Sequence, residues 1–206
     1  MNVLQEKINV DDFEGFIDAL STVPDQIATA ALMCIMLTYD APVHDRYIRA
    51  LLRHPGTKVV AFALAKTVGG PKNLDPDVFD MALSKTEFKT DDDVDGLFWT
   101  AARASRYHEV REILRVRIDR CGISASMVGS YVALKNGRVD PKKHLQPMQD
   151  LGIDFARFPD VLPGAMRVPG MGRELVKLGI PKSAAYNVSM RYLNSPWYRD
   201  AITREF

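Results

Sequence analysis

The acidic segment at residues 90–96 is the part of the sequence closest to a metal-binding motif. Four of its residues match the first, third, fifth and sixth positions of an EF-hand calcium loop: Asp91, Asp93, Asp95 and Gly96. The twelfth position is Ala102, where that loop needs a bidentate Glu. The alternative is a group of carboxylates at the start of a helix over residues 97–104, where the helix dipole favours negative charge. We expect this second role and no metal site.

Histidine and cysteine are too scattered to suggest a metal or catalytic centre. No zinc-like spacing occurs among the histidines, which we expect at the surface or at helix ends: His44, His54, His108 and His144. Cys34 and Cys121 cannot make a disulfide scaffold, so burial or a reducing compartment is expected. Cys121 lies near Arg117 and Arg120, whose charges would favour a reactive thiolate. A small buried residue at a helix end is the alternative that we expect.

Residues 169–172, Pro-Gly-Met-Gly, form the only glycine-rich element of the sequence. No strand pattern precedes it, and it lacks the third glycine and the Lys-Ser/Thr pair of nucleotide-binding loops. A turn between helices explains it. We therefore expect no catalytic residues, no cofactor and no small-molecule substrate, although the chain could be a subunit of an enzyme complex.

Charge is balanced over the whole chain but not along it. With 27 Lys and Arg against 26 Asp and Glu, the net charge is +1, which argues against a protein built mainly to neutralise phosphate. Residues 155–206, however, hold 8 basic and 4 acidic residues interleaved with aromatic ones. Such side chains can form a protein interface, a single-strand nucleic-acid surface, or a solvated helix face over an aromatic core. The candidate partner-binding residues there are Arg157, Arg167, Arg173, Arg191, Tyr192, Trp197 and Tyr198.

A second group of arginines contains two pairs three residues apart (103/106 and 117/120) and one pair four residues apart (111/115), so that it follows a helical hairpin: Arg103, Arg106, Arg111, Arg115, Arg117 and Arg120. Of these, Arg111 and Arg115 join the candidate partner-binding residues, because the group could hold an acidic partner surface. Salt bridges within the hairpin, to residues such as Glu109, Glu112 and Asp119, are the alternative.

The elements that must position these residues all have helical spacing. Helix starts are predicted at Asp11 with Glu14 (an acidic capping box), at Pro24, at Pro42, at Thr57 and at Asp75. Alternate helices start near residues 11, 42, 75, 107 and 140, which is the spacing of a two-helix repeat. We expect an all-α fold of antiparallel hairpins stacked as a short right-handed α-solenoid; a general helical bundle is the alternative.

A short motif recurs between the later helices. Leu-Gly-Ile occurs at residues 151–153 and 178–180, and Cys-Gly-Ile at residues 121–123 is a near match. Each glycine is predicted to take the left-handed conformation that ends a helix, with the isoleucine packed back on the preceding turn.

The later part of the chain resembles a pentatricopeptide repeat (PPR) protein. The residues that carry the resemblance are Lys135-Asn136-Gly137-Arg138-Val139-Asp140, Leu145, Met148 and Leu151-Gly152-Ile153, with residues 104–123 similar to the second helix of the preceding repeat. Pro141 and Lys143 depart from the family pattern. The resemblance is best over residues 93–153 and fades to shorter units beyond them. It divides the chain into N-terminal helical pairs (1–90), as part of the same array or as a cap, and PPR-like repeats (91–206).

The resemblance implies a mitochondrial protein of the matrix side that binds RNA or belongs to a large assembly. In RNA-binding members, fixed positions on the repeats read bases, and here they fall near Tyr131, Val161 and Val188, with junction partners Ser126, Ala156 and Ser183. Valine has no donor or acceptor for a base edge. We therefore expect a structural subunit that docks to other protein subunits, in the catalytic head of a mitochondrial ATP synthase of the euglenozoan type first, and in a mitochondrial ribosome next. An organellar single-stranded RNA-binding protein is the alternative, and no membrane insertion is expected, since the longest apolar run, residues 30–37, is too short.

Overall fold

The computed structural model describes residues 3–38, 44–70, 74–123, 149–153, 176–177, 179 and 181–183. The chain divides into two compact units, residues 1–117 and 118–206. The described residues form α1 (Val3–Asn9), α2 (Phe13–Leu20), α3 (Asp25–Leu37), α4 (Asp45–Arg53), β1 (Val59–Val60), α5 (Ala61–Gly69), α6 (Pro76–Ser84), β2 (Thr86–Glu87), α7 (Asp91–Arg103) and α8 (Tyr107–Cys121). Apart from two strands of two residues each, the described part is helical, as predicted. None of its helices is long and apolar enough to cross a membrane.

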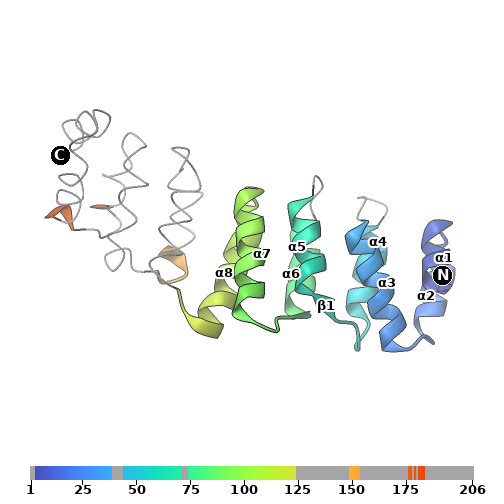
Figure 1. Cartoon of the computed structure of the whole chain (residues 1–206). Helices are drawn as coiled ribbons and strands as arrows, with labels where there is room; N and C mark the ends of the chain where they lie inside the picture. The colour runs from blue at the N-terminus through green and yellow to red at the C-terminus, as the bar shows by residue number, and fades with distance from the viewer. Residues whose placement is uncertain are drawn as a thin grey trace. The chain divides into compact units, whose positions relative to one another are not determined.

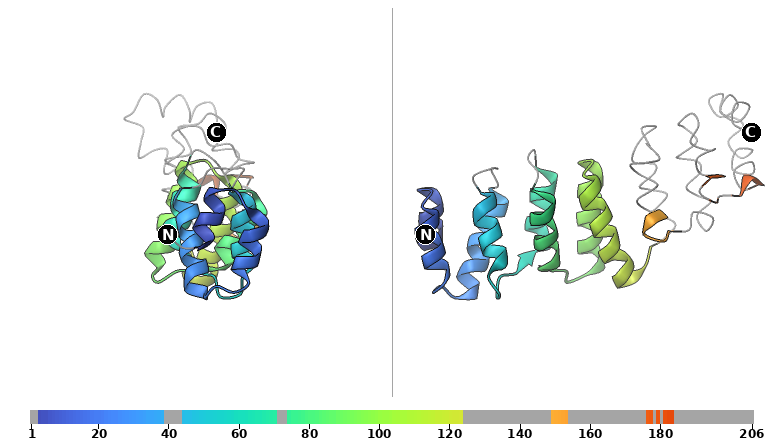
Figure 2. Two further views of the ribbon diagram at one scale, coloured as in Figure 1. Left: turned by 90° about the vertical axis from the view of Figure 1, so that its right-hand side faces the viewer. Right: turned by 180° about the vertical axis from the view of Figure 1, so that it is seen from behind.

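In the first unit the helices form consecutive pairs that lie side by side in chain order (Figure 1). The first helices of the pairs contact one another, α1 with α3, α3 with α5 and α5 with α7. The second helices α2, α4 and α6 do the same. Two layers of helices result, and Figure 2 shows them from the end and from behind. The largest fully buried side chains of this unit include Tyr47, Phe16, Phe79 and Phe98.

Helix α4 illustrates how the sequence specifies this packing. Its apolar residues recur at helical spacing and are fully buried: Tyr47, Ile48, Leu51 and Leu52. The opposite side of the helix carries Arg46, Arg49 and Arg53. Burying one face therefore fixes the direction in which the three arginines project.

The spacing of the second helices confirms the predicted two-helix period in the first unit. They begin at Phe13, Asp45, Pro76 and Tyr107, at intervals of 32, 31 and 31 residues. The predicted starts near residues 11, 42, 75 and 107 are within three residues of these positions. The predicted start near residue 140 lies outside the described residues.

Two local predictions at helix starts are wrong. The α2 cap is Asp12, whose carboxylate accepts from the backbone N–H of Gly15 at 2.9 Å, because Asp11 takes a left-handed φ of 57° to end α1. Thr57 does not cap α5, which begins four residues later at Ala61. The β-branched Val59 and Val60 instead pair in parallel with Thr86 and Glu87.

The glycine prediction is confirmed where it can be observed. Gly122, Gly152 and Gly179 have φ values of 73°, 85° and 103°, in the left-handed region that glycine adopts without strain. Each accompanies a helical turn: the N–H of Gly122 donates to Ile118, and that of Gly152 to Gln149. Ile153 is buried, as expected for an isoleucine that follows such a turn.

Candidate functional site

The acidic segment at residues 90–96 belongs to a helix start and not to a calcium loop. Helix α7 begins at Asp91, six residues earlier than predicted, and Thr90 precedes it as the cap. The Asp93 carboxylate accepts from the backbone N–H groups of Thr90 at 3.0 Å and Lys89 at 2.9 Å, and these bonds lower the pKa of Asp93. Within the described ranges, no group of three His, Cys, Asp or Glu residues could hold a metal ion.

The described histidines have structural partners. His108 Nε2 lies 2.8 Å from Asp80 Oδ1 and joins α8 to α6, and His54 Nδ1 lies 3.6 Å from Asp25. His144 lies outside the described residues. Both cysteines are exposed, so the burial expected for Cys121 is wrong, and burial, one of the two alternatives for Cys34, is wrong as well. Cys121 is the last residue of α8, whose buried residues Glu109, Val110, Ile113 and Leu114 all lie in its first eight positions.

The arginines between residues 103 and 120 divide between two roles. Arg117 donates to Asp95 of α7 at 2.6 Å, and Arg106 donates to the Gly70 carbonyl at 3.1 Å, so both hold helices together. Arg111 and Arg115, the two proposed for partner binding, are about half exposed and lie 4.0 and 3.1 Å from the Glu112 carboxylate.

The other candidate partner-binding residues lie outside the described residues: Arg157, Arg167, Arg173, Arg191, Tyr192, Trp197 and Tyr198. The same holds for the base-reading positions except Ser183, which is exposed.

Polar contacts join successive second helices in a constant register. Arg49, the fifth residue of α4, binds Asp77, the second residue of α6. Asp80, the fifth residue of α6, contacts His108, the second residue of α8. We call these two fifth-to-second contacts the ladder contacts. Arg111 is the fifth residue of α8 and so occupies the same position as Arg49 and Asp80.

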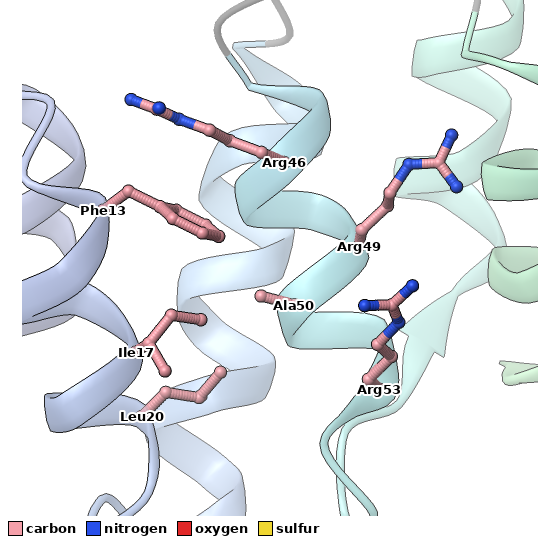
Figure 3. Close-up of a pocket in the computed structure, with 7 residues that line it drawn as sticks. All are labelled: Phe13, Ile17, Leu20, Arg46, Arg49, Ala50 and Arg53. Atoms are coloured by element: carbon pink, nitrogen blue, oxygen red, sulfur yellow. The ribbon is translucent and has the colours of Figure 1, made fainter.

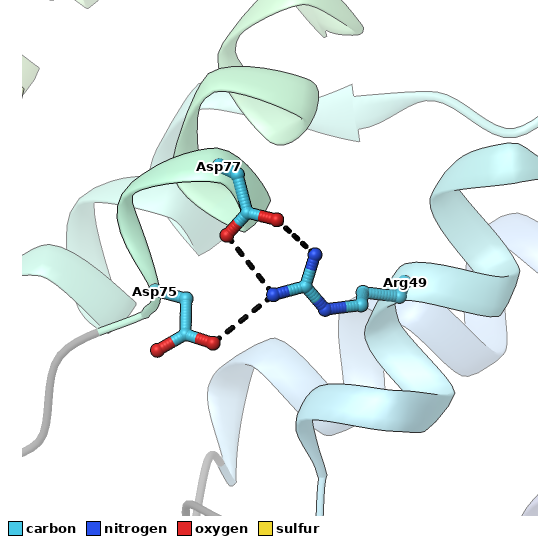
Figure 4. A network of polar contacts seen from close by, with 3 residues as sticks. All are labelled: Arg49, Asp75 and Asp77. Atoms are coloured by element: carbon cyan, nitrogen blue, oxygen red, sulfur yellow. Dashed lines mark hydrogen bonds and ion pairs between the residues drawn. The ribbon is translucent and has the colours of Figure 1, made fainter.

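The contact at Arg49 is the more extensive one (Figure 4). Its guanidinium donates through both terminal nitrogens to Asp77, one bond measuring 2.9 Å, and a further bond of 3.0 Å reaches Asp75, the cap residue of α6. Hydrogen bonding to Arg49 lowers the pKa of Asp77. Both carboxylates also lie at the N-terminus of α6, where the helix dipole favours them.

The joint between α2 and α4 has no ladder contact. The fifth residue of α2 is Ile17, which is 41% exposed, and the second residue of α4 is Arg46. Arg46 turns to Asp11, which also accepts from the Tyr47 hydroxyl at 2.9 Å. The two bonds, chiefly that to Arg46, lower the pKa of Asp11, while burial first and the Asp11 bond second raise the pKa of Tyr47.

A groove of about 400 Å³ opens at this joint (Figure 3). We call it the α2–α4 groove. Its lining consists of apolar residues and three arginines: Phe13, Ile17, Leu20, Arg46, Arg49, Ala50 and Arg53. The Arg46 guanidinium lies 5.0 Å from the centre of the Phe13 ring, a cation–π distance. Among the residues that the structure describes, no acidic one is part of this lining.

A second groove, of about 630 Å³, lies between the first helices α5 and α7. Phe62, with 60% exposure, and Lys66 line it from α5, and Asp92 and Asp93 line it from α7. Its floor is formed by small residues such as Gly96, over which there is open space. Because acidic and basic side chains both border this groove, its charge does not select one kind of partner.

Sequence reasoning missed the ladder contacts and the α2–α4 groove. The signal was present in the second and fifth residues of the second helices: Glu14 and Ile17, Arg46 and Arg49, Asp77 and Asp80, His108 and Arg111. Aligning these helices at their first residues would have shown opposite charges at the fifth residue of α4 and the second residue of α6. It would also have shown that, of these helices, α2 has an apolar fifth residue.

Comparison of the chain with protein-family models, with curated proteins and with solved structures finds no match. The resemblance to PPR proteins therefore stays a prediction that depends on the residues quoted for it.

Proposed function

We propose that the chain is a non-catalytic accessory subunit of a mitochondrial multiprotein complex and acts by docking to other proteins. In this proposal the helix pairs of the first unit continue through residue 206 as a short right-handed PPR-like α-solenoid. The catalytic head of a mitochondrial ATP synthase is the favoured complex, and a mitochondrial ribosome is next.

The observation that carries the proposal is the use of polar side chains in the first unit. In the ladder contacts, the charged side chains of Arg49 and Asp80 join one helix pair to the next in the same register. An array built in this way is a scaffold with extended outer faces, which is how stacked helical repeats bind partners. Those faces carry apolar side chains such as Ile17 and Phe62, which a partner protein can cover.

The RNA-binding alternative depends on the basic residues of the last third and on base-reading positions occupied by valine at residues 161 and 188. It predicts salt-dependent affinity for single strands, because each phosphate contact releases counterions. It also predicts that exchanging Arg157, Arg167 and Arg173 for Gln abolishes that affinity.

The decisive experiment is purification of the tagged full chain from its native cells, with and without ribonuclease, followed by mass spectrometry. A stoichiometric protein complex that ribonuclease leaves intact supports the docking role, and its composition identifies the assembly. Companions that disappear on ribonuclease treatment, and RNA binding lost in the triple Arg→Gln variant, would overturn it. A chain recovered alone in both preparations would overturn it too.

A further inference from the structure

We propose that the α2–α4 groove is a docking site for an acidic peptide segment of a partner protein, with one apolar side chain in the groove and a carboxylate on Arg53. This inference deepens the proposed docking function and rests on it. It assigns a site and a partner chemistry within the described residues, apart from the basic last third of the chain.

The series of ladder contacts is interrupted at the joint between α2 and α4. Where α4 meets α6, and where α6 meets α8, a charged fifth residue contacts the next helix. At the corresponding position α2 presents Ile17, and the space beside it remains open as the groove. The joint therefore lacks one polar contact of the series and exposes an apolar side chain in its place.

Arg53 carries a positive charge at the edge of the groove. Arg53 is the ninth residue of α4, and its counterpart in α8 is Arg115, which lies 3.1 Å from Glu112. The residue that corresponds to Glu112 in α4 is Ala50, which lines the groove. Arg53 is exposed and has no ion pair within the part of the chain that the structure describes. An incoming carboxylate would supply the missing partner.

The other two arginines of the lining are held in place by contacts within the chain. Arg46 is held by Asp11 and lies over the Phe13 ring, and Arg49 is held by Asp75 and Asp77. Side chains fixed in advance lose little entropy when a partner binds. Figure 3 shows Arg46 projecting toward Phe13 and Arg49 projecting to the other side of α4. Because both are paired with carboxylates, Arg53 carries the positive charge of the lining that is unpaired among the described residues.

The size and the charge of the groove limit its occupant. A volume of about 400 Å³ accommodates one or two large apolar side chains, not a folded domain. Since Arg46 and Arg49 are already paired and Arg53 has no ion pair among the described residues, a carboxylate beside the apolar side chain is the complementary charge. Residues 155–206 of the chain itself are basic, with 8 Lys and Arg against 4 Asp and Glu, so they do not supply this charge.

The test is selection of short peptides from a displayed random library on the full chain, followed by affinity measurement with the synthetic winners by fluorescence anisotropy. We expect the winners to combine an aromatic or aliphatic residue with neighbouring Asp or Glu. Ile17→Glu and Arg53→Glu should each weaken their binding by about tenfold or more, as for anchor residues of other interfaces. Arg53→Ala provides a milder loss of the same charge.

Matched controls separate the groove from general charge effects. Arg103→Glu makes the same charge change as Arg53→Glu, at an exposed arginine outside the groove. Val10→Glu makes the same charge change as Ile17→Glu, at an apolar residue with 73% exposure. Both should leave peptide affinity unchanged. Thermal unfolding of all variants confirms that they remain folded, which is expected because the substituted side chains are exposed.

Several outcomes would overturn the assignment: no enriched peptides, basic winners, or winners that bind the groove variants as well as the original chain. Oligouridine binding lost in Arg53→Glu but kept in Ile17→Glu would assign the arginines to RNA, and self-association abolished by Ile17→Glu would make a second copy the occupant. Purification of the Ile17→Glu chain from native cells distinguishes the two proposals. If the complex forms normally, the groove assignment fails alone; if the original chain forms no complex, the docking function fails.

Discussion

Thr67 shows how a single hydroxyl joins two helices of the first layer. It is 2% exposed, and its Oγ1 lies 3.0 Å from the carbonyl oxygens of Met36 and Ala63. Met36 belongs to the last turn of α3, where backbone carbonyl groups have no N–H donor within the helix. The Thr67 hydroxyl of α5 can therefore donate to a carbonyl at the C-terminus of α3 or to the Ala63 carbonyl of its own helix.

Thr67→Val should lower the free energy of unfolding by roughly 1–3 kcal/mol, because it leaves the buried Met36 carbonyl without this donor. Urea denaturation followed by circular dichroism measures the change. Thr100→Val is the control, since the Thr100 hydroxyl donates at 2.9 Å to Gly96 of its own helix in an exposed bond, and valine keeps the methyl group that lies beside Gly69. A loss in Thr100→Val as large as in Thr67→Val would contradict the role given to the α3 terminus.

The lowered pKa of Asp77 predicts how the stability of the chain depends on pH. Hydrogen bonding to Arg49 lowers its pKa in the folded chain below the ordinary 3.8. The unfolded chain therefore takes up a proton first as the pH falls, so the contribution of this pair is present above pH 3.8 and is lost below it. Unfolding of the original chain should become easier over this acidic range.

Asp77→Asn and Arg49→Gln should each reduce this dependence of stability on acidic pH, and the double variant should behave like either single one. Urea midpoints measured from neutral pH down through the acidic range provide the test. If the effects of the two substitutions simply add, Arg49 and Asp77 are not coupled and the ladder contact has no energetic role.

At the scale of the elements, two glycines of the first-layer helices have different surroundings. A Cβ added at Gly69 of α5 would lie 2.9 Å from the Thr100 Cγ2 of α7, so glycine permits the close approach of these two helices. A Cβ added at Gly96 of α7 would meet nothing within 4 Å. Gly96 therefore contributes only the conformational cost of glycine in a helix.

Gly96→Ala should stabilise the chain by about 0.5–1 kcal/mol, the usual difference between alanine and glycine inside a helix. Gly69→Ala should give no such gain, since the gain is offset by displacement of Thr100 or of α7. Thermal unfolding of the two variants side by side tests the contrast. Equal stabilisation by both substitutions would mean that α5 and α7 are not held at this distance.

The elements were largely predictable from the sequence, because helix signals are local. Pro76 at the first position of α6 and the apolar spacing of α4 each indicate one helix. Errors occur where contacts distant in sequence decide the outcome. Asp11 is drawn away from a capping role by Arg46 and Tyr47, and the segment after Thr57 pairs with residues 86–87.

At the scale of the whole molecule, the candidate site was less predictable than the fold. The sequence directs attention to arginines and aromatics in the last third, which lie outside the described residues. The α2–α4 groove needs Phe13 and Ile17 from one helix and Arg53 from another, 40 residues apart along the chain between Phe13 and Arg53. Only the packing of one pair on the next brings them together.

Together, the ladder contacts and the α2–α4 groove predict that a carboxylate at position 17 stabilises the chain and weakens docking. Ile17→Asp places a carboxylate in the fifth position of α2, opposite Arg46 in the second position of α4, as Asp80 stands opposite His108. This variant should be more stable than Ile17→Asn at low salt, by the small amount typical of exposed ion pairs, and the difference should disappear at high salt.

Both variants at Ile17 should lose affinity for acidic peptides, because each removes the apolar side chain from the groove, and the Asp variant should lose more through repulsion. Urea denaturation at two salt concentrations and anisotropy on the same samples make the comparison. If Ile17→Asp is the less stable variant, the fifth-to-second register does not extend to this joint. If it keeps peptide binding, the groove is not the docking site. If Ile17→Asp is the more stable variant and loses peptide binding, the joint between α2 and α4 lacks a stabilising contact at the position where a partner binds.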